Sequence, residues 1–203
     1  MTKTALPLVI STAVRQPRDD RRDVQSLRRL VRGDRDALGD LYDAHAAALF
    51  RHGLALTRCM ADAEDLVQAV FLKLATTGAP LIAVRSPGNY LHRILRAAWI
   101  DEQRRPAVSR EAPLQEDDDA SLWDGRLARR SGRAAGADDV DAAIDVTRAL
   151  ATLPAVQREI VQLHLIEGFS FREAGRITGV SMFTAASRYR VALGRLRQMM
   201  GRR

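Results

Sequence analysis

A stretch of about 35 residues without a hydrophobic period divides the sequence into two segments that do have one. It covers residues 106–139, is dominated by Ala, Ser, Gly, Pro, Asp and Arg, and contains the acidic run Glu116–Asp119. Loops without secondary structure rarely exceed about 15 residues inside a compact domain. We therefore predict that residues 106–139 form a flexible acidic linker between two separate domains.

The segment before the linker, residues 23–105, is predicted to be a compact helical domain. Its clearest helix places apolar residues at i, i+3, i+4 and i+7 spacing, which forms one stripe on the helix surface. This stripe consists of Ala63, Leu66, Val67, Val70, Phe71 and Leu74. Asp34 is a suitable N-cap for the helix before it. Ser86 followed by Pro87 is typical of the start of the helix after it.

The segment after the linker, residues 140–203, has the spacing of a helix-turn-helix. Ser170 and Glu173 have the pattern of a capping box for the first helix of the pair. Gly179 suits the positive φ of a tight turn, and Gly175 is the smallest residue where the next helix presses closest. No strand pattern of useful length occurs in either segment. We therefore predict an all-α chain of two small helical domains.

The predicted last helix carries polar and basic side chains that suit the base edges and phosphates of duplex DNA. The candidate DNA contacts are Ser181, which can also cap this helix, Thr184, Ser187, Arg188 and Arg190, with Arg172 from the preceding helix.

The net charge of +7 is unevenly distributed along the chain. It divides into +3 for residues 1–22, +2 for 23–105, −3 for 106–140 and +5 for 141–203. Basic segments on both sides of an acidic linker indicate polyanion contacts at separate places. Residues 1–22, with two Pro and four Arg, are predicted to form a flexible basic arm.

Two polar surfaces of the first domain are also candidates for binding. The helix that begins at Pro87 mixes basic and aromatic groups, with Asn89, Tyr90, Arg93 and Arg96. Aromatic rings stack on unpaired bases while Arg binds phosphates, although Tyr90 would equally fill a hydrophobic core. The helix over residues 63–74 carries Glu64, Asp65 and Gln68 away from its apolar stripe, which by itself is also typical of a solvated face.

The residues do not indicate an enzyme. The motifs H-E-x-x-H, G-x-S-x-G, Walker A and G-x-G-x-x-G are absent from the sequence. The four His residues have no ligand-like spacing with the single Cys59. We therefore expect no catalytic residue, no metal site and no cofactor. No apolar run approaches the roughly 18 residues of a spanning helix, and Pro7 interrupts a short first apolar run, so we expect a cytoplasmic protein without membrane insertion.

Several motifs, in order, resemble one protein family. Residues 63–74, Ala-Glu-Asp-Leu-Val-Gln-Ala-Val-Phe-Leu-Lys-Leu, resemble the hallmark helix of the extracytoplasmic-function (ECF) sigma factors of bacterial RNA polymerase. Residues 90–96 and 101–105 are similar to the promoter-reading helix that follows it. The family's C-terminal domain is matched at residues 153–160, 167–170 and 179–188.

The resemblance implies a sigma factor, which is a dissociable polymerase subunit that directs promoter-specific initiation. The first domain would bind the clamp helices of the β′ subunit through Glu64, Asp65 and Gln68. It would also melt the −10 element and capture unpaired bases with the loop Thr76–Ser86 and with Asn89, Tyr90, Arg93 and Arg96. The second domain would contact the β flap and read the −35 element with its last helix. The implied partners are core RNA polymerase, promoter DNA and an anti-sigma factor.

The chain departs from the family at three positions. Ala69 stands where the family usually has Glu or Asp, and weakens one polar contact with polymerase. Ala97 replaces the usual Asn, which brings one −10 base contact into question. Ala186 replaces a frequent Lys or Arg, and shifts −35 reading toward Ser187, Arg188 and Arg190.

Two other functions remain open from the residues alone. A helix-turn-helix repressor or activator that binds duplex DNA as a dimer accounts for the second domain and leaves residues 63–74 without a role. A helical adaptor for protein partners leaves the Arg-rich last helix without one.

Overall fold

The computed structural model describes residues 20–104 and 150–200, and these residues form helices without a strand. The first domain consists of α2 (Asp20–Val31), α3 (Asp36–Thr57), α4 (Met60–Thr77), the 3-10 helix η1 (Ala79–Ala83) and α5 (Pro87–Arg104). The second consists of α8 (Ala155–Val161), the π-helical turn η3 (Gln162–Ile166), α9 (Phe171–Thr178) and α10 (Met182–Met200). The predicted fold class is confirmed for this part of the chain. None of its helices has both the length and the apolar character needed to cross a membrane.

The element boundaries agree with the sequence patterns at most positions. α5 begins at Pro87, as predicted. Asp34 lies one residue before the N-cap position of α3, and its carboxylate still accepts a hydrogen bond from the backbone N–H of Asp36 at 3.0 Å. The expected arm 1–22 is too long, because α2 begins at Asp20. The carboxylates of Asp20 and Asp23 lie in the first turn of α2, where they interact favourably with the positive end of the helix dipole. The rest of that arm and the predicted linker lie outside the described residues.

The core of the first domain forms where α3, α4 and α5 meet. The apolar stripe of α4 is buried along its whole length, and its members are at most 7% exposed. It packs against Leu41 and Leu49 of α3 and against Leu91 and Leu95 of α5. Each fully buried Leu-sized side chain contributes about 2 kcal/mol by removal from water, so this stripe sets the position of α4 in the bundle.

The second domain has two small apolar clusters. One joins Ile160, Leu163 and Phe169 to Ala174, Ile177 and Ala185. The other joins Leu153 and Val161 to Ala192 and Leu196. Both clusters include residues of α10, and both therefore fix the rotation of α10 about its own axis.

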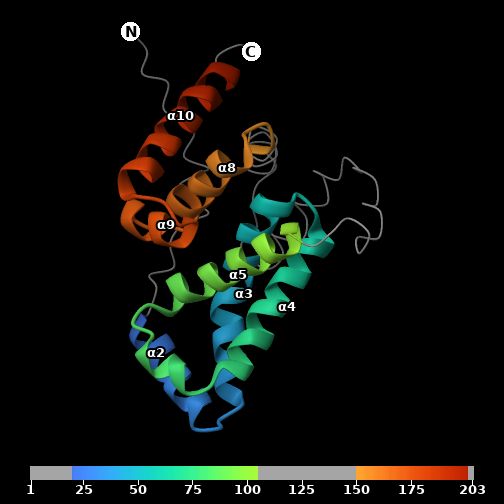
Figure 1. Ribbon diagram of the computed structural model, residues 1–203, viewed down its shortest axis with the longest axis vertical. Helices are drawn as coiled ribbons and strands as arrows, with labels where there is room; N and C mark the ends of the chain where they lie inside the picture. The colour runs from blue at the N-terminus through green and yellow to red at the C-terminus, as the bar shows by residue number, and fades with distance from the viewer. Residues whose placement is uncertain (1–19, 105–149, 201–203) are drawn as a thin grey trace, which may run out of the picture.

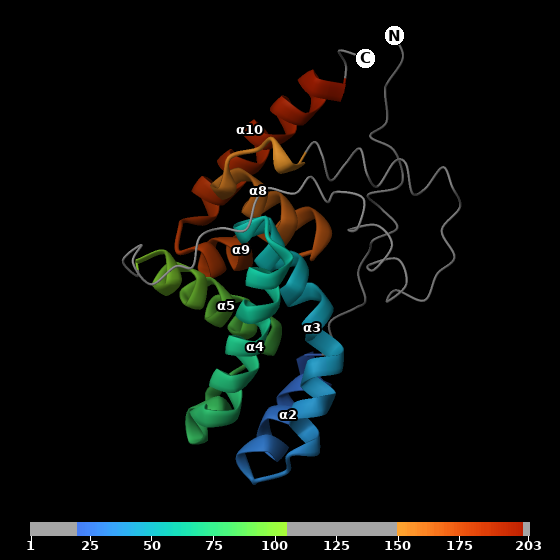
Figure 2. The ribbon, with the colours of Figure 1, turned by 90° about the vertical axis from the view of Figure 1, so that its right-hand side faces the viewer.

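The two domains are in direct contact. Figures 1 and 2 show the second domain seated on one end of the first, with α9 beside α5 and α8 beside α3. Figure 1 shows α10, in red, extending away from the first domain. The sequence patterns predicted two domains and did not predict this contact.

Candidate functional site

One face of α10 is uncovered, and it carries three of the predicted DNA contacts. Ser187 and Arg190 lie opposite the buried Ala185 and Ala192, and both are exposed. Thr184, one turn before Ser187 and Arg188, is exposed as well. Ser187 and Arg190 therefore occupy the centre of this face.

The other two predicted contacts of this helix lie outside the uncovered face or at its edge. Arg188 lies at the edge of the face and is half-buried. Ser181 precedes the helix, and its hydroxyl accepts a hydrogen bond from the backbone N–H of Thr184 at 3.0 Å. That bond confirms Ser181 as the N-cap. The exposed Arg172 comes from the first turn of α9.

The turn before α10 is held tightly. Gly179 adopts the predicted positive φ, +70°, and its N–H bonds to the carbonyl of Gly175. A Cβ added at Gly175 would lie 2.7 Å from the carbonyl oxygen of Val180, which is closer than real contacts allow. The capping box of Ser170 and Glu173 is also present. The start of α10 is therefore rigidly placed relative to α9.

The surface around this helix pair is strongly basic. Between residues 168 and 200, the charged side chains are those of one Glu, Glu173, and six Arg: Arg172, Arg176, Arg188, Arg190, Arg195 and Arg197. Such a surface attracts a polyanion such as the DNA backbone.

The predicted −10 residues of α5 differ in their accessibility. Arg93 is exposed, whereas Tyr90 is half-buried against the core of the first domain. The Asn89 side-chain amide donates to Ser86 Oγ at 2.9 Å and to Glu173 Oε1 of the second domain at 3.1 Å. Arg96 Nε donates to Glu159 Oε1, also of the second domain, at 2.9 Å. Asn89 and Arg96 are thus engaged between the domains.

A row of three buried polar side chains, Glu159, His52 and His92, connects the two domains. The Glu159 carboxylate is 2% exposed and lies 3.4 Å from His52 Nε2. His52 Nδ1 in turn lies 3.0 Å from His92 Nδ1 of α5. A carboxylate only accepts hydrogen bonds, so with both rings neutral the protons are assigned to His52 Nε2 and His92 Nδ1. His92 also packs edge-on against Phe169 of the second domain, with ring centroids 5.0 Å apart.

Two arginines complete the contact between the domains. Arg158, which is 8% exposed, donates to the backbone carbonyls of Ala55 in the first domain and Leu153 in its own. Burial, with a smaller effect of the nearby Arg58, lowers the pKa of Arg158. Arg51 of α3 forms a bidentate pair with Glu167, with its Nε and Nη2 at 2.8 and 2.9 Å from the two carboxylate oxygens.

The polar face of α4 points away from the core. Glu64, Asp65 and Gln68 are all exposed, as they would be on either a binding face or a solvated face. Leu72, one turn after Gln68, is 69% exposed. Leu72 was not among the predicted site residues, although its position outside the apolar stripe of the same helix indicates an exposed Leu.

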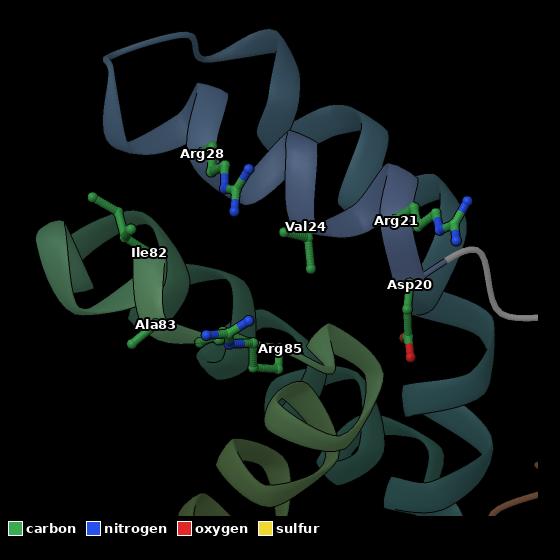
Figure 3. A pocket seen from close by; sticks show the side chains of 8 residues that line it. Asp20, Arg21, Val24, Arg28, Ile82, Ala83 and Arg85 are labelled. Carbon is green, nitrogen blue, oxygen red and sulfur yellow. The ribbon is translucent and has the colours of Figure 1, made fainter.

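An open cavity of about 530 Å³ lies between α2 and η1. Four of its lining residues, 82–85, belong to the predicted loop Thr76–Ser86. Figure 3 shows Arg28 and Val24 of α2 on one side of this space, and Ile82 and Arg85 on the other. The lining residues are Asp20, Arg21, Val24, Arg28, Ile82, Ala83, Val84 and Arg85.

The comparisons with known proteins agree with this architecture. Residues 41–107 match the model of Sigma-70 region 2, and residues 143–196 match that of Sigma-70, region 4. The ECF RNA polymerase sigma factor SigM of Mycobacterium tuberculosis is 31% identical over 184 residues, which cover 91% of this chain and 87% of SigM. The chain belongs to the ECF sigma factors. It is therefore a sigma factor that directs transcription initiation, and its family binds RNA polymerase and promoter DNA.

Other relatives of this ECF sigma factor show similar coverage. The ECF sigma factor SigL of Mycobacterium tuberculosis is 31% identical over 161 residues, 77% of this chain and 85% of SigL. The RNA polymerase sigma factor CarQ of Myxococcus xanthus is 30% identical over 171 residues, 83% of this chain and 92% of CarQ. The structure of CnrH, solved in complex with the cytosolic domain of CnrY, has the same fold with a TM-score of 0.58 and 22% identity. It covers 89% of this chain and 97% of CnrH.

Proposed function

We propose that the two domains of this sigma factor divide the promoter between them, as a non-catalytic subunit acting in the cytoplasm. The first domain binds the β′ clamp of core polymerase and opens the −10 element, and the second contacts the β flap and reads the −35 element. The observation that carries this proposal is the uncovered basic face of α10, which is rigidly placed by the turn before it and joined to a domain with a separate exposed binding face.

The polymerase face is the exposed side of α4. Glu64, Asp65 and Gln68 supply polar contacts, and Leu72 supplies an apolar group that a partner protein can cover. An exposed Leu beside carboxylates is typical of a protein interface, where an apolar centre is surrounded by a polar rim. Ala69, half-buried beside this face, adds no polar contact.

The −10 site lies at the start of α5 and in the loop before it. Arg93 is accessible for a phosphate, and the cavity between α2 and η1 offers Arg28 and Arg85 beside the apolar side chains of Val24 and Ile82. This combination suits a single strand, because guanidinium groups bind its phosphates while apolar side chains contact its bases. Ala97 is exposed, and its methyl group supplies no hydrogen bond to a base.

The −35 site is the uncovered face of α10. Ser187 and Arg190 occupy its centre, with Thr184 toward the N-terminal end that enters the major groove. Arg188 lies at the edge and is better placed for the DNA backbone. The half-buried Ala186 leaves direct readout to Ser187 and Arg190.

Promoter binding requires the two domains to separate. The centres of the −35 and −10 elements are about 25 base pairs apart, which is about 85 Å along duplex DNA. In the structure, Asn89 of the −10 site is hydrogen-bonded to Glu173 of the helix-turn-helix at 3.1 Å. In this arrangement the −10 site and the −35 site cannot reach their promoter elements at the same time. We therefore propose that the structure is a closed state, in which Asn89 and Arg96 are held by the second domain until the sigma factor assembles on polymerase and DNA.

An anti-sigma factor is the third proposed partner. The structural relative CnrH was solved in complex with the cytosolic domain of CnrY. We propose that this sigma factor is likewise controlled by a protein that keeps its domains from reaching a promoter.

The test is run-off transcription by core RNA polymerase on fragmented genomic DNA, with and without the full-length chain. We expect the chain to produce initiation at defined sites that share a −35 and a −10 element. Binding to core polymerase without promoter-specific transcripts would contradict the proposal, and so would DNA binding without polymerase.

A further inference from the structure

Phe183 is the most exposed large apolar side chain in the described part of the chain, at 77%. It is the second residue of α10 and follows Met182, which is 39% exposed. The helix cannot rotate to cover it, because Ala185 and Ala192 on the opposite side are fully buried. Phe183 therefore stays in solvent at the N-terminal end of the helix unless another molecule covers it.

The position of Phe183 aligns it with the polar residues that face DNA in the proposed function. Phe183, Ser187 and Arg190 are at i, i+4 and i+7, so they form one line along the uncovered face of α10. Phe183 is at the end of this line that enters the groove first. A helix that presents Ser187 and Arg190 to base edges brings Phe183 to the base edges as well.

The major groove offers one apolar group to such a side chain. Among the four bases, only thymine presents a methyl group there, and Phe is among the residues that contact it. We propose that Phe183 contacts the C5-methyl group of one thymine in the −35 element and so sets a preference for T at that base pair. This inference rests on the proposed function, in which α10 enters the major groove at the −35 element.

Charge favours DNA over a protein as the molecule that covers Phe183. The surrounding helix pair carries six Arg and one Glu between residues 168 and 200. Arg190, two turns after Phe183 on the same face, and Arg172 of α9 are both exposed. A nucleic acid neutralises these charges as it covers Phe183, whereas an apolar protein surface would leave them without counter-charges.

The experiment removes only the methyl group from the DNA. The −35 element preferred by the wild-type holoenzyme is first determined by selection, and each thymine in it is then replaced singly by deoxyuridine. Holoenzyme binding is measured on each promoter by fluorescence anisotropy. We expect one replacement to weaken binding about fourfold, which corresponds to the burial of one methyl-sized group. Phe183→Ala holoenzyme should bind the thymine and uracil promoters equally, and Phe183→Leu should keep part of the difference.

Val191→Ala is the matched control, because Val191 is a 48% exposed apolar residue further along the same helix. This variant should keep the fourfold sensitivity to deoxyuridine. The proposal is overturned if Phe183→Ala keeps the wild-type sensitivity, if no thymine is sensitive, or if Phe183→Ala loses only binding to core polymerase. In these cases Arg190→Ala separates the failure of the Phe183 contact from the failure of the proposed function. If Arg190→Ala changes the −35 preference, α10 still reads the −35 element. If no α10 variant changes that preference, the proposed function is contradicted as well.

Discussion

The contact between the two domains in the closed state depends in part on Arg51. This side chain lies on α3 and is 24% exposed, and its guanidinium forms two hydrogen bonds with Glu167, whose side chain is 5% exposed. The pair exists only while the domains are in contact. Arg51→Met keeps an unbranched helix-forming side chain and removes both charge-assisted bonds, so it should weaken the closed state and leave each domain folded.

The size of the effect follows from the environment of the pair. Breaking a fully buried ion pair costs about 3–5 kcal/mol, because a charge is left in the interior. Arg51 is partly exposed, and Glu167 keeps the hydrogen bond from Gln162 at 2.8 Å, so we expect a smaller cost of about 2 kcal/mol. That shifts the equilibrium between closed and open states about 30-fold toward the open state.

The assay is the distance between two nitroxide labels, measured by double electron–electron resonance. The exposed Ala47 and Gln198 are replaced by Cys in a Cys59→Ser background. We expect the free wild-type chain to give a short distance and Arg51→Met to add a long one. The charge-swapped variant Arg51→Glu with Glu167→Arg should restore part of the short distance. Arg35→Met, which removes an exposed Arg from the start of the same helix, is the control and should behave as wild type.

Two results would refute this reasoning. The first is a distance distribution for Arg51→Met that equals that of the wild type, which would mean that the ion pair does not hold the domains together. The second is a wild-type chain that already gives mainly the long distance, because the closed state would then not be the major state in solution.

Three further predictions concern the separate surfaces. Asp65→Arg with Gln68→Arg should weaken binding to core polymerase by about 2 kcal/mol without loss of helicity. Asp43→Arg, which changes an exposed acidic residue on α3, should not weaken it. Equal binding of both variants in a titration with labelled core polymerase would exclude the α4 face as the polymerase-binding surface. Arg190→Ala should relax base preference at one −35 position, whereas the half-buried Arg188→Ala should mainly lower affinity and reduce the salt slope by about 1; selection on randomised −35 elements distinguishes the two effects. Gly175→Ala should destabilise the second domain by about 1–3 kcal/mol, because its Cβ would lie 2.7 Å from the carbonyl oxygen of Val180; an unchanged thermal unfolding midpoint would show that the turn can move.

Local interactions made much of the fold readable from the sequence. The stripe from Ala63 to Leu74 predicts the buried side of α4, because a helix repeats every 3.6 residues and one face must be apolar. The starts of three helices follow from Pro87, Ser170 and Ser181, since caps and first-turn residues act on neighbouring N–H groups. The positive φ of Gly179 belongs to the same class of local effects.

The tertiary structure decided what lies between the domains. Arg158 and Glu159 look like ordinary surface residues of a short helix, yet both are buried because α8 packs against α3. Their partners, Ala55, His52 and Arg96, are 63 to 107 residues away in the sequence. No periodicity or capping pattern contains such a pairing, because it depends on how two folded domains fit together.

The exposure of individual site residues was decided at the same level. Composition placed Arg188 and Arg190 together in one basic helix, and only the burial of Ala185, Ala192 and Leu196 shows that Arg190 faces outward while Arg188 lies at the edge. The sequence determines which side chains belong to a helix and roughly where that helix begins. Its rotation, and therefore the residues it presents to DNA or polymerase, depends on the neighbours against which its apolar face is buried.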